Sequence, residues 1–150
     1  MKLSSRGRYG LKAMVDLAIE YGSGPVSAAV LASKQGISLA YLEQLIAALR
    51  KAKLIVSNRG VLGGYVLSRP PQEITVGEVL RVLEGNTDLV DCVGQDKNRI
   101  CENACTCSAR PLWLKLQSRI NGVLNETTIL DLADDNIEQM RRLDEEANLS

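Results

Sequence analysis

The chain has 150 residues, 45% of them hydrophobic, which suffices for one core or for a compact domain joined to an oligomerisation helix. Its first residues lack the apolar segment of a signal peptide and no apolar run approaches the roughly 18 residues of a membrane span, so we expect a cytoplasmic protein. The net charge of zero hides a division: residues 1–70 carry ten Lys and Arg against three acidic residues, whereas residues 71–150 carry eight against fifteen. Such a basic half is typical of a nucleic-acid-binding module joined to a second unit.

Three helices are predicted in the basic half. The first covers about Arg8–Tyr21. Ser27 is placed to cap a short second helix that ends near Gly36, and Ser38 to cap a third over about 39–52. The apolar face of the first helix comprises Met14, Leu17, Ala18 and Tyr21.

The third helix has two distinct faces at about 100° per residue. The apolar face comprises Leu39, Leu42, Leu45, Ile46 and Leu49, and the opposite face comprises Ala40, Gln44, Ala47 and Lys51. Two short helices around a glycine-containing turn form a helix-turn-helix, whose second helix enters the DNA major groove. We therefore expect Ser38, Ala40 and Gln44 to face the bases and Lys51 to contact phosphates.

A β-hairpin is predicted after this helix. Residues 54–56 and 65–67 are apolar segments, and glycines at 60, 63 and 64 lie between them. Beside a helix-turn-helix such a hairpin is a wing, and its Arg59 is expected to enter a narrow minor groove. The Walker spacing of a phosphate loop is absent.

The second half begins with a capping box. Thr75 and Glu78 open a predicted helix that Gly85 closes. A polar loop follows over 86–109, and Pro111 opens a long helix whose apolar stripe is expected to join two subunits. The stripe comprises Leu112, Leu116, Ile120, Val123 and Leu124.

The predicted fold is therefore mainly α-helical, in four parts. These are a winged helix-turn-helix over 1–70, a linker helix and cysteine-bearing loop over 71–109, a dimerisation helix over 110–133 and a weakly ordered tail over 134–150.

All four cysteines, Cys92, Cys101, Cys105 and Cys107, lie within sixteen residues. In a cytosolic chain such a cluster indicates metal or redox chemistry rather than structural disulfides. Thiolates suit iron–sulfur clusters, zinc or copper(I), and the spacing lacks the C-x-x-C pairs usual for structural zinc. A thiol switch and inert cysteines remain open. Without any His and without a catalytic constellation, we do not expect an enzyme.

Three segments resemble the winged-helix bacterial regulators that include IscR, NsrR and the cysteine-metabolism repressor CymR. They are the opening segment 1–10, the segment 37–45, and the motif Arg59-Gly60-x-x-Gly63-Gly64-Tyr65. The likeness extends to about residue 133. It implies a homodimer that reads a palindromic operator in double-stranded DNA. We further expect Arg6 and Arg8 to contact the DNA phosphates or a groove.

The resemblance is closest to IscR-type regulators and implies a 2Fe–2S cluster, with 4Fe–4S as the alternative. Cys92, Cys101 and Cys107 match the family's cysteine trio, and Arg110 stands where IscR members commonly carry a His. For the fourth ligand we favour Glu43, because an acid on a recognition helix is repelled by phosphate and needs a reason. A cytosine contact or an internal ion pair are other reasons for this acid, and Cys105, Glu102 and Asp91 are other candidate ligands.

The sequence thus predicts a cluster-sensing repressor of iron–sulfur cluster assembly genes. Its rivals are a nitric-oxide sensor with a 4Fe–4S cluster and a cysteine-metabolism repressor without a cluster. A small iron–sulfur electron-transfer protein belongs to a different class, and its ligand spacing would differ.

Overall fold

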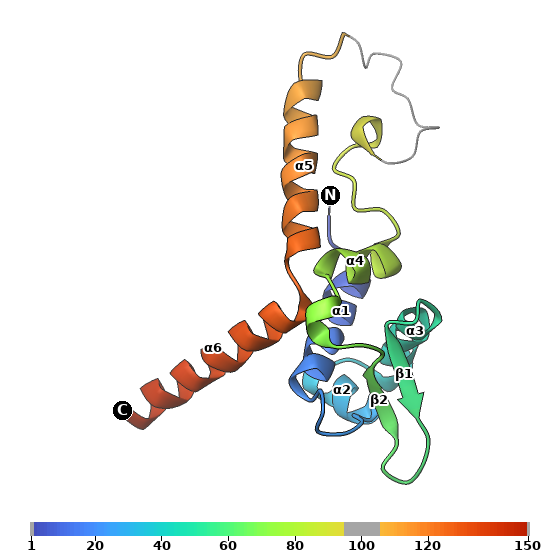
Figure 1. Ribbon diagram of the computed structural model, residues 1–150, viewed down its shortest axis with the longest axis vertical. Coiled ribbons are helices and arrows are strands. Elements are labelled where there is room, and N and C mark those ends of the chain that lie inside the picture. The colour runs from blue at the N-terminus through green and yellow to red at the C-terminus, as the bar shows by residue number, and fades with distance from the viewer. Residues whose placement is uncertain (1, 95–105, 150) are drawn as a thin grey trace.

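The computed structural model describes residues 2–94 and 106–149, which form a mainly helical fold with one two-stranded antiparallel hairpin (Figure 1). The elements are α1 (Ser5–Ile19), α2 (Ala28–Gln35), α3 (Leu39–Lys51), β1 (Ile55–Asn58), β2 (Gly64–Leu67), the short 3-10 helix η1 (Pro71–Glu73), α4 (Val76–Glu84), a second 3-10 helix η2 (Asp91–Val93), α5 (Arg110–Glu126) and α6 (Ile129–Leu149). The prediction of a winged helix-turn-helix followed by a long helix is confirmed. Cys101, Cys105 and Glu102 lie outside the described residues.

The start of α2 and α3 follows from their serine caps. Ser27 Oγ accepts a hydrogen bond from Val30 N at 3.2 Å, and Ser38 Oγ accepts one from Tyr41 N at 3.1 Å. Gly36 ends α2 in the left-handed conformation at φ 65°, which costs glycine least. The predicted turn between the two helices is therefore present.

The bounds of α1 differ from the prediction. The helix begins at Ser5, because Ser4 Oγ accepts from Gly7 N at 3.2 Å and caps it three residues earlier than predicted. It ends at Ile19, so Tyr21 lies beyond the helix and is 46% exposed. Placing Tyr21 on the apolar face was therefore wrong.

The core forms where α1, α2, α3 and α4 meet. The predicted face of α3 is buried except for Leu39, which lies in the first turn and is 45% exposed. The buried members pack with Met14 and Leu17 of α1 and Leu31 of α2. One core thus fixes both helices of the helix-turn-helix.

The wing is fastened to the start of α2. Ile55 pairs with Leu67 and Asn58 with Gly64 across the hairpin. Tyr65 N donates to Val26 O at 2.8 Å, and Val26 N donates to Tyr65 O at 3.0 Å. A Cβ on Gly64 would lie 2.4 Å from Val26 O, so only glycine permits this approach.

The C-terminal part differs from the predicted helix over 110–133 and weakly ordered tail. The chain bends at Thr127 and Thr128, because Val76 N donates to Thr127 O and Ile129 N donates to Ile74 O, both at 2.9 Å. Thr128 and Asp131 then cap a new helix, α6, through two reciprocal hydrogen bonds. Buried Ile129 and the pairing of successive turns, such as Arg142 with Glu138 at 2.8 Å, explain why the expected tail is helical.

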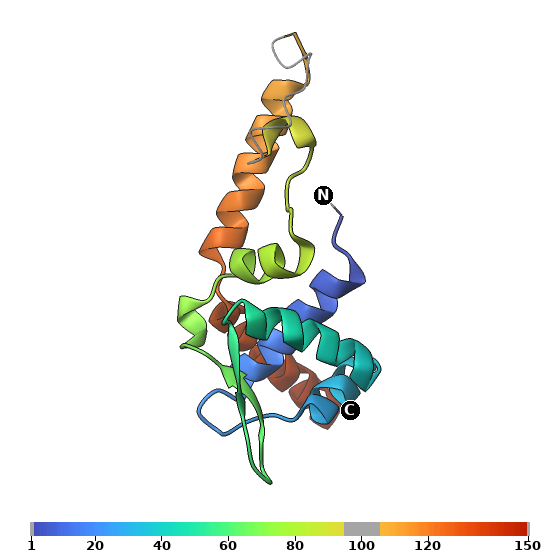
Figure 2. The same cartoon turned by 90° about the vertical axis from the view of Figure 1, so that its right-hand side faces the viewer.

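The two views show an elongated molecule (Figures 1 and 2). The helix α5 rises from one end of the body, the hairpin extends from the other, and α6 crosses α1 and continues away from it. None of the helices that the structure describes is long and apolar enough to span a lipid bilayer.

Candidate DNA interface and cysteine site

The residues expected to read bases lie on the exposed face of α3. Ser38, Ala40 and Gln44 are all exposed, and so is Lys51, about two turns beyond Gln44. The opposite face is held on α1, where the rings of Tyr41 and Tyr9 meet edge to face at 6.3 Å between centroids. A rigid helix therefore presents its small and polar side to solvent, as a recognition helix requires.

A shallow pocket of about 280 Å³ joins the exposed side of α3 to β2. Glu43 lies there with Arg50 and Lys51, but no hydrogen bond or ion pair within the described residues engages its carboxylate. Within the described residues, therefore, the internal ion pair considered as a reason for this acid is not formed. A role toward DNA or toward a ligand remains.

The wing lies on the same side of the molecule as α3, the side that Figure 2 turns toward the reader. Arg59, directly after β1, is exposed and has no partner in the described part of the chain. Arg50, Lys51 and Lys53 are exposed as well, so one face carries both the recognition helix and a basic border.

The other predicted DNA contacts, Arg6 and Arg8, lie in the first turns of α1. Arg6 is half-buried and its Nε donates to Leu83 O at 3.0 Å, whereas Arg8 is exposed and bonds Ser5 Oγ at 3.3 Å. Arg6 thus ties α1 to the end of α4, and its contact with DNA stays a prediction.

A joint between α1 and α4 was not anticipated from the sequence. Glu84 Oε1 accepts from Ser4 N at 2.9 Å and from Ser4 Oγ at 2.7 Å, at the positive end of α1. A Cβ on Gly7 would lie 2.0 Å from this oxygen, and a Cβ on Gly10 would lie 2.3 Å from Leu83 Cδ1. The spacing of Gly7 and Gly10 puts both on one helix face, and this was the feature of the sequence that could have predicted a close contact there. The cysteine segment begins directly after this joint.

The described cysteines frame the start of α5. Cys92 lies in η2, which packs on α5. Cys107 lies two residues before Ala109, the N-cap residue of α5. Both are partly buried and neither forms a disulfide. Gln117, only 4% exposed, fastens the segment to α5, because its Oε1 accepts from Leu89 N and its Nε2 donates to Asn121 Oδ1.

The chemistry near these thiols suits an anionic group. Arg110 Nε is buried and has no hydrogen-bond partner within the described residues, while Arg110 N donates to Cys107 O at 3.3 Å. A buried charged donor without a partner is costly. A cluster held by thiolates is negatively charged and could supply the acceptor that this guanidinium nitrogen is missing. The residues present therefore fit such a group.

The described residues of one chain do not bring Glu43 together with Cys92 and Cys107, and Cys101 lies outside the described residues. Among those residues no group of three or more Cys, Asp or Glu side chains could hold a metal ion. In both views α3, which carries Glu43, lies apart from η2 and the start of α5 (Figures 1 and 2). Glu43 and the two described cysteines therefore lie on elements that one chain holds apart.

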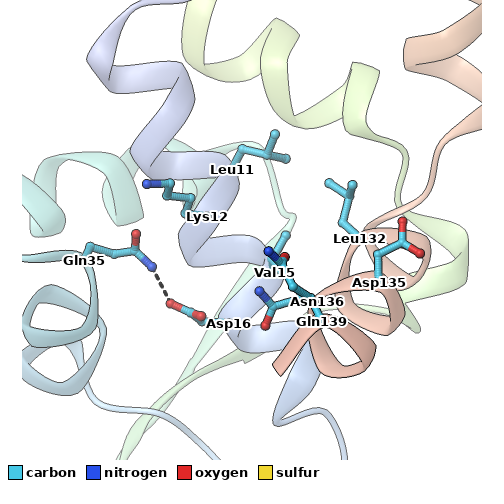
Figure 3. A pocket seen from close by; sticks show the side chains of 9 residues that line it. All are labelled: Leu11, Lys12, Val15, Asp16, Gln35, Leu132, Asp135, Asn136 and Gln139. Atoms are coloured by element: carbon cyan, nitrogen blue, oxygen red, sulfur yellow. Dashed lines mark hydrogen bonds between the residues drawn. The ribbon is translucent and has the colours of Figure 1, made fainter. Parts of the chain in front are cut away.

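A groove of about 470 Å³ lies where α6 crosses α1 (Figure 3). Gln35 donates to the Asp16 carboxylate at its edge, and Leu11 and Leu132 approach one another from α1 and α6. Lys12, Val15, Asp135, Asn136 and Gln139 complete its lining. None of the predicted site residues lies here.

Comparisons with known proteins agree with the winged helix-turn-helix fold of this chain. The family model described as "Rrf2: Iron-dependent Transcriptional regulator" matches residues 3–135. The IscR regulator of Photobacterium profundum is 43% identical over 136 residues, which cover 91% of this chain and 77% of that protein. Among solved structures, CymR, the global cysteine regulator of B. subtilis, is 42% identical with a TM-score of 0.76, covering 89% of this chain and 97% of that one. IscR of T. potens is 40% identical with a TM-score of 0.71, covering 91% and 88%. The chain belongs to the Rrf2 family of DNA-binding transcriptional regulators.

Proposed function

We propose that this regulator is a repressor that responds to an iron–sulfur cluster and controls cluster assembly genes. The observation that carries the proposal is the buried Nε of Arg110, which has no partner in the described chain and lies three residues after the partly buried, unbridged Cys107. A structural cysteine pair would leave this buried donor without a hydrogen-bond acceptor. The similarity to IscR proteins supports the same conclusion.

Cys92, Cys101 and Cys107 are the proposed protein ligands, with Glu43 of the other protomer as the fourth and Cys105 as its alternative. A bound 2Fe–2S cluster would link the cysteine segment of one chain to the recognition helix of the other. Thiolates supply three strong ligands, whereas a carboxylate is a weaker, exchangeable one. The cluster would then make different contacts in the two DNA-binding states of the protein. A sensor requires this, because a ligand shifts an equilibrium only if it binds the two states with different affinity.

Within one chain the joint between α1 and α4 is the route to the DNA-binding half. The segment that carries Cys92 leaves α4 at Gly85, directly after the Glu84 carboxylate that caps α1. A shift of the cysteine segment would change the end of α4 and therefore the position of α1. The helix α1 packs on both α2 and α3, so the shift would reach the recognition helix.

Two such chains form the functional unit that we propose. Three apolar side chains of the predicted stripe on α5 remain exposed in one chain: Leu112 at 52%, Leu116 at 39% and Val123 at 63%. Covering this stripe with the α5 of a second copy removes it from water and places two recognition helices for a palindromic operator.

The metal content tests the proposal directly. Iron, acid-labile sulfide and zinc are measured per chain on protein purified without oxygen. About two iron and two sulfide per chain are expected, and about four of each would favour the nitric-oxide-sensing alternative with 4Fe–4S. Zinc alone, or no metal, would contradict the cluster proposal.

A cysteine-metabolism regulator without a cluster is the second candidate. The similarity to the global cysteine regulator CymR favours this second candidate, since the CymR structure matches the present chain as well as the IscR structure does. The two candidates differ in one measurement: operator affinity before and after anaerobic cluster reconstitution. An unchanged affinity together with no bound iron would support the second candidate.

A further inference from the structure

The tip of the wing carries two exposed apolar side chains. Gly63 N donates to Gly60 O at 3.0 Å, which closes a tight turn with Val61 and Leu62 at its two corners. Val61 is 104% exposed and Leu62 is 88% exposed, the highest values among the large exposed hydrophobic side chains of the DNA-binding half. Nothing in the described part of the chain covers either side chain.

The turn has a built geometry that holds this pair outward. Gly60 has φ 130°, a conformation that side chains disfavour. A Cβ on Gly63 would lie 2.5 Å from Asn58 O, so the interior of the turn has no room for a side chain. The glycines close the tip, and the apolar residues occupy the two positions where a side chain must face solvent.

The surroundings of the tip indicate what it meets. Arg59 directly precedes the turn, and Lys53 lies at the base of the hairpin. In both views the hairpin extends beyond the body on the side that carries α3 (Figures 1 and 2). A partner that approaches this face must therefore be polyanionic and must offer an apolar wall at the depth of the tip. The DNA minor groove does both, because its walls are deoxyribose and its floor is base edges.

We propose that Val61 and Leu62 enter the minor groove beside Arg59 and pack against deoxyribose and partly unstacked bases. The proposal rests on the DNA-binding function of the family and adds an apolar contact to it. Pyrimidine–purine steps unstack most readily, so the contact favours operators with such a step under each wing. The wing then reads DNA deformability, whereas α3 reads base edges.

Apolar and ionic contacts leave different signatures in salt. A basic side chain that neutralises a phosphate releases counterions, which lowers the slope of log affinity against log salt by about 0.9 per contact when it is removed. An apolar contact releases none. Removing Leu62 therefore weakens binding by the same factor at every salt concentration.

The experiment measures fluorescence anisotropy of the full-length protein on a duplex that it has itself selected from a random pool, over a range of salt concentrations. Leu62→Ser is expected to weaken binding about tenfold with the salt slope unchanged. Arg59→Ala is expected to reduce the slope by about 0.9 for each wing. Leu149→Ser is the matched control, because Leu149 is 89% exposed at the far end of α6.

A second readout follows the DNA itself. A fluorescent adenine analogue at the step beneath the wing is expected to brighten when the wild-type protein binds, and to brighten less with Leu62→Ser. Equal affinities for Leu62→Ser and Leu149→Ser would overturn the proposal. So would a lower melting temperature of free Leu62→Ser protein, since Leu62 would then pack within the free protein, in the pocket that Val61 and Leu62 line together with Val26 and Val30. Failure of the wild-type protein to select any duplex would instead contradict DNA binding itself.

Discussion

The DNA-binding half, residues 1–70, and the cysteine-bearing half present their candidate residues in different ways. Ser38, Ala40 and Gln44 lie exposed on one helix whose other face is fixed in the core, so one chain presents these three candidate base-reading residues together. Cys92 and Cys107 are partly buried, and α3, which carries Glu43, lies apart from η2 and the start of α5 (Figure 1). The comparison indicates that each chain folds its own candidate reading surface, whereas the proposed sensing site needs contributions from separate segments and, as we propose, separate chains.

The largest expected effect tests whether the two halves share one site. Glu43→Ala is expected to lower retained iron at least tenfold on gel filtration under anaerobic conditions, whereas Cys105→Ala leaves it intact. The reason is that Glu43 supplies the proposed fourth ligand. The opposite pattern, with iron lost only from Cys105→Ala, would confine the site to the cysteine segment.

The second prediction separates contacts within the DNA-binding half. Lys51→Ala is expected to weaken binding about tenfold across duplexes and to reduce the salt slope by about 0.9 per half-site, because Lys51 meets phosphate. Gln44→Ala is expected to change preference at particular bases, at about 1–3 kcal/mol each, with the slope unchanged. Anisotropy titrations on selected and scrambled duplexes measure both. Identical behaviour of the two variants would contradict the proposed docking of α3.

The third prediction tests the joint that connects the halves. Gly10→Ala is expected to lower the free energy of unfolding by about 1–2 kcal/mol, because its methyl group meets buried Leu83 and outweighs the helix preference for alanine. Urea denaturation measures the change. Gly122→Ala in α5 is the matched control, since nothing lies within 4 Å of its Cβ position in one chain. It should raise stability by up to about 1 kcal/mol, and a loss there would reveal a partner helix at this position.

The smallest expected effect concerns pH and the ion pair between Arg69 and Glu78, which links the two halves. Burial raises the pKa of Glu78, but hydrogen bonds from Thr75 and the Arg69 guanidinium outweigh it and hold the pKa below its usual 4.5. A carboxyl whose pKa is lowered by folding stabilises the protein above pH 4.5, and this contribution is lost as the pH falls through the lowered value. Thermal melts between neutral and acid pH should therefore depend less on pH in Glu78→Gln. An unchanged pH dependence would show that other carboxyls dominate the acid transition.

Local sequence determined several elements in both halves. Ser27, Ser38 and the Thr75–Glu78 box set helix starts through hydrogen bonds within three residues, so their effect needs no tertiary context. The apolar period of α3 likewise predicted, except at Leu39, which face is buried and which side is exposed. The glycine motif at 60–64 predicted the hairpin for the same reason, since only a tight turn needs such residues.

Other features depended on segments that meet only in the folded chain. The break between α5 and α6 depends on η1 and α4, whose backbone bonds Thr127 and Ile129. The role of Glu84 depends on the N-terminus of α1, eighty residues earlier. The lack of a partner for Arg110 Nε within the described residues depends on burial at the start of α5, which periodicity does not encode. The sequence by itself therefore determined the family, the starts of α2, α3 and α4, the hairpin and the two faces of α3, because short motifs, short-range hydrogen bonds and helical periodicity encode them. The tertiary structure alone decided the joint between α1 and α4, the break before α6 and the separation of α3 from η2, because all three depend on which distant segments pack together.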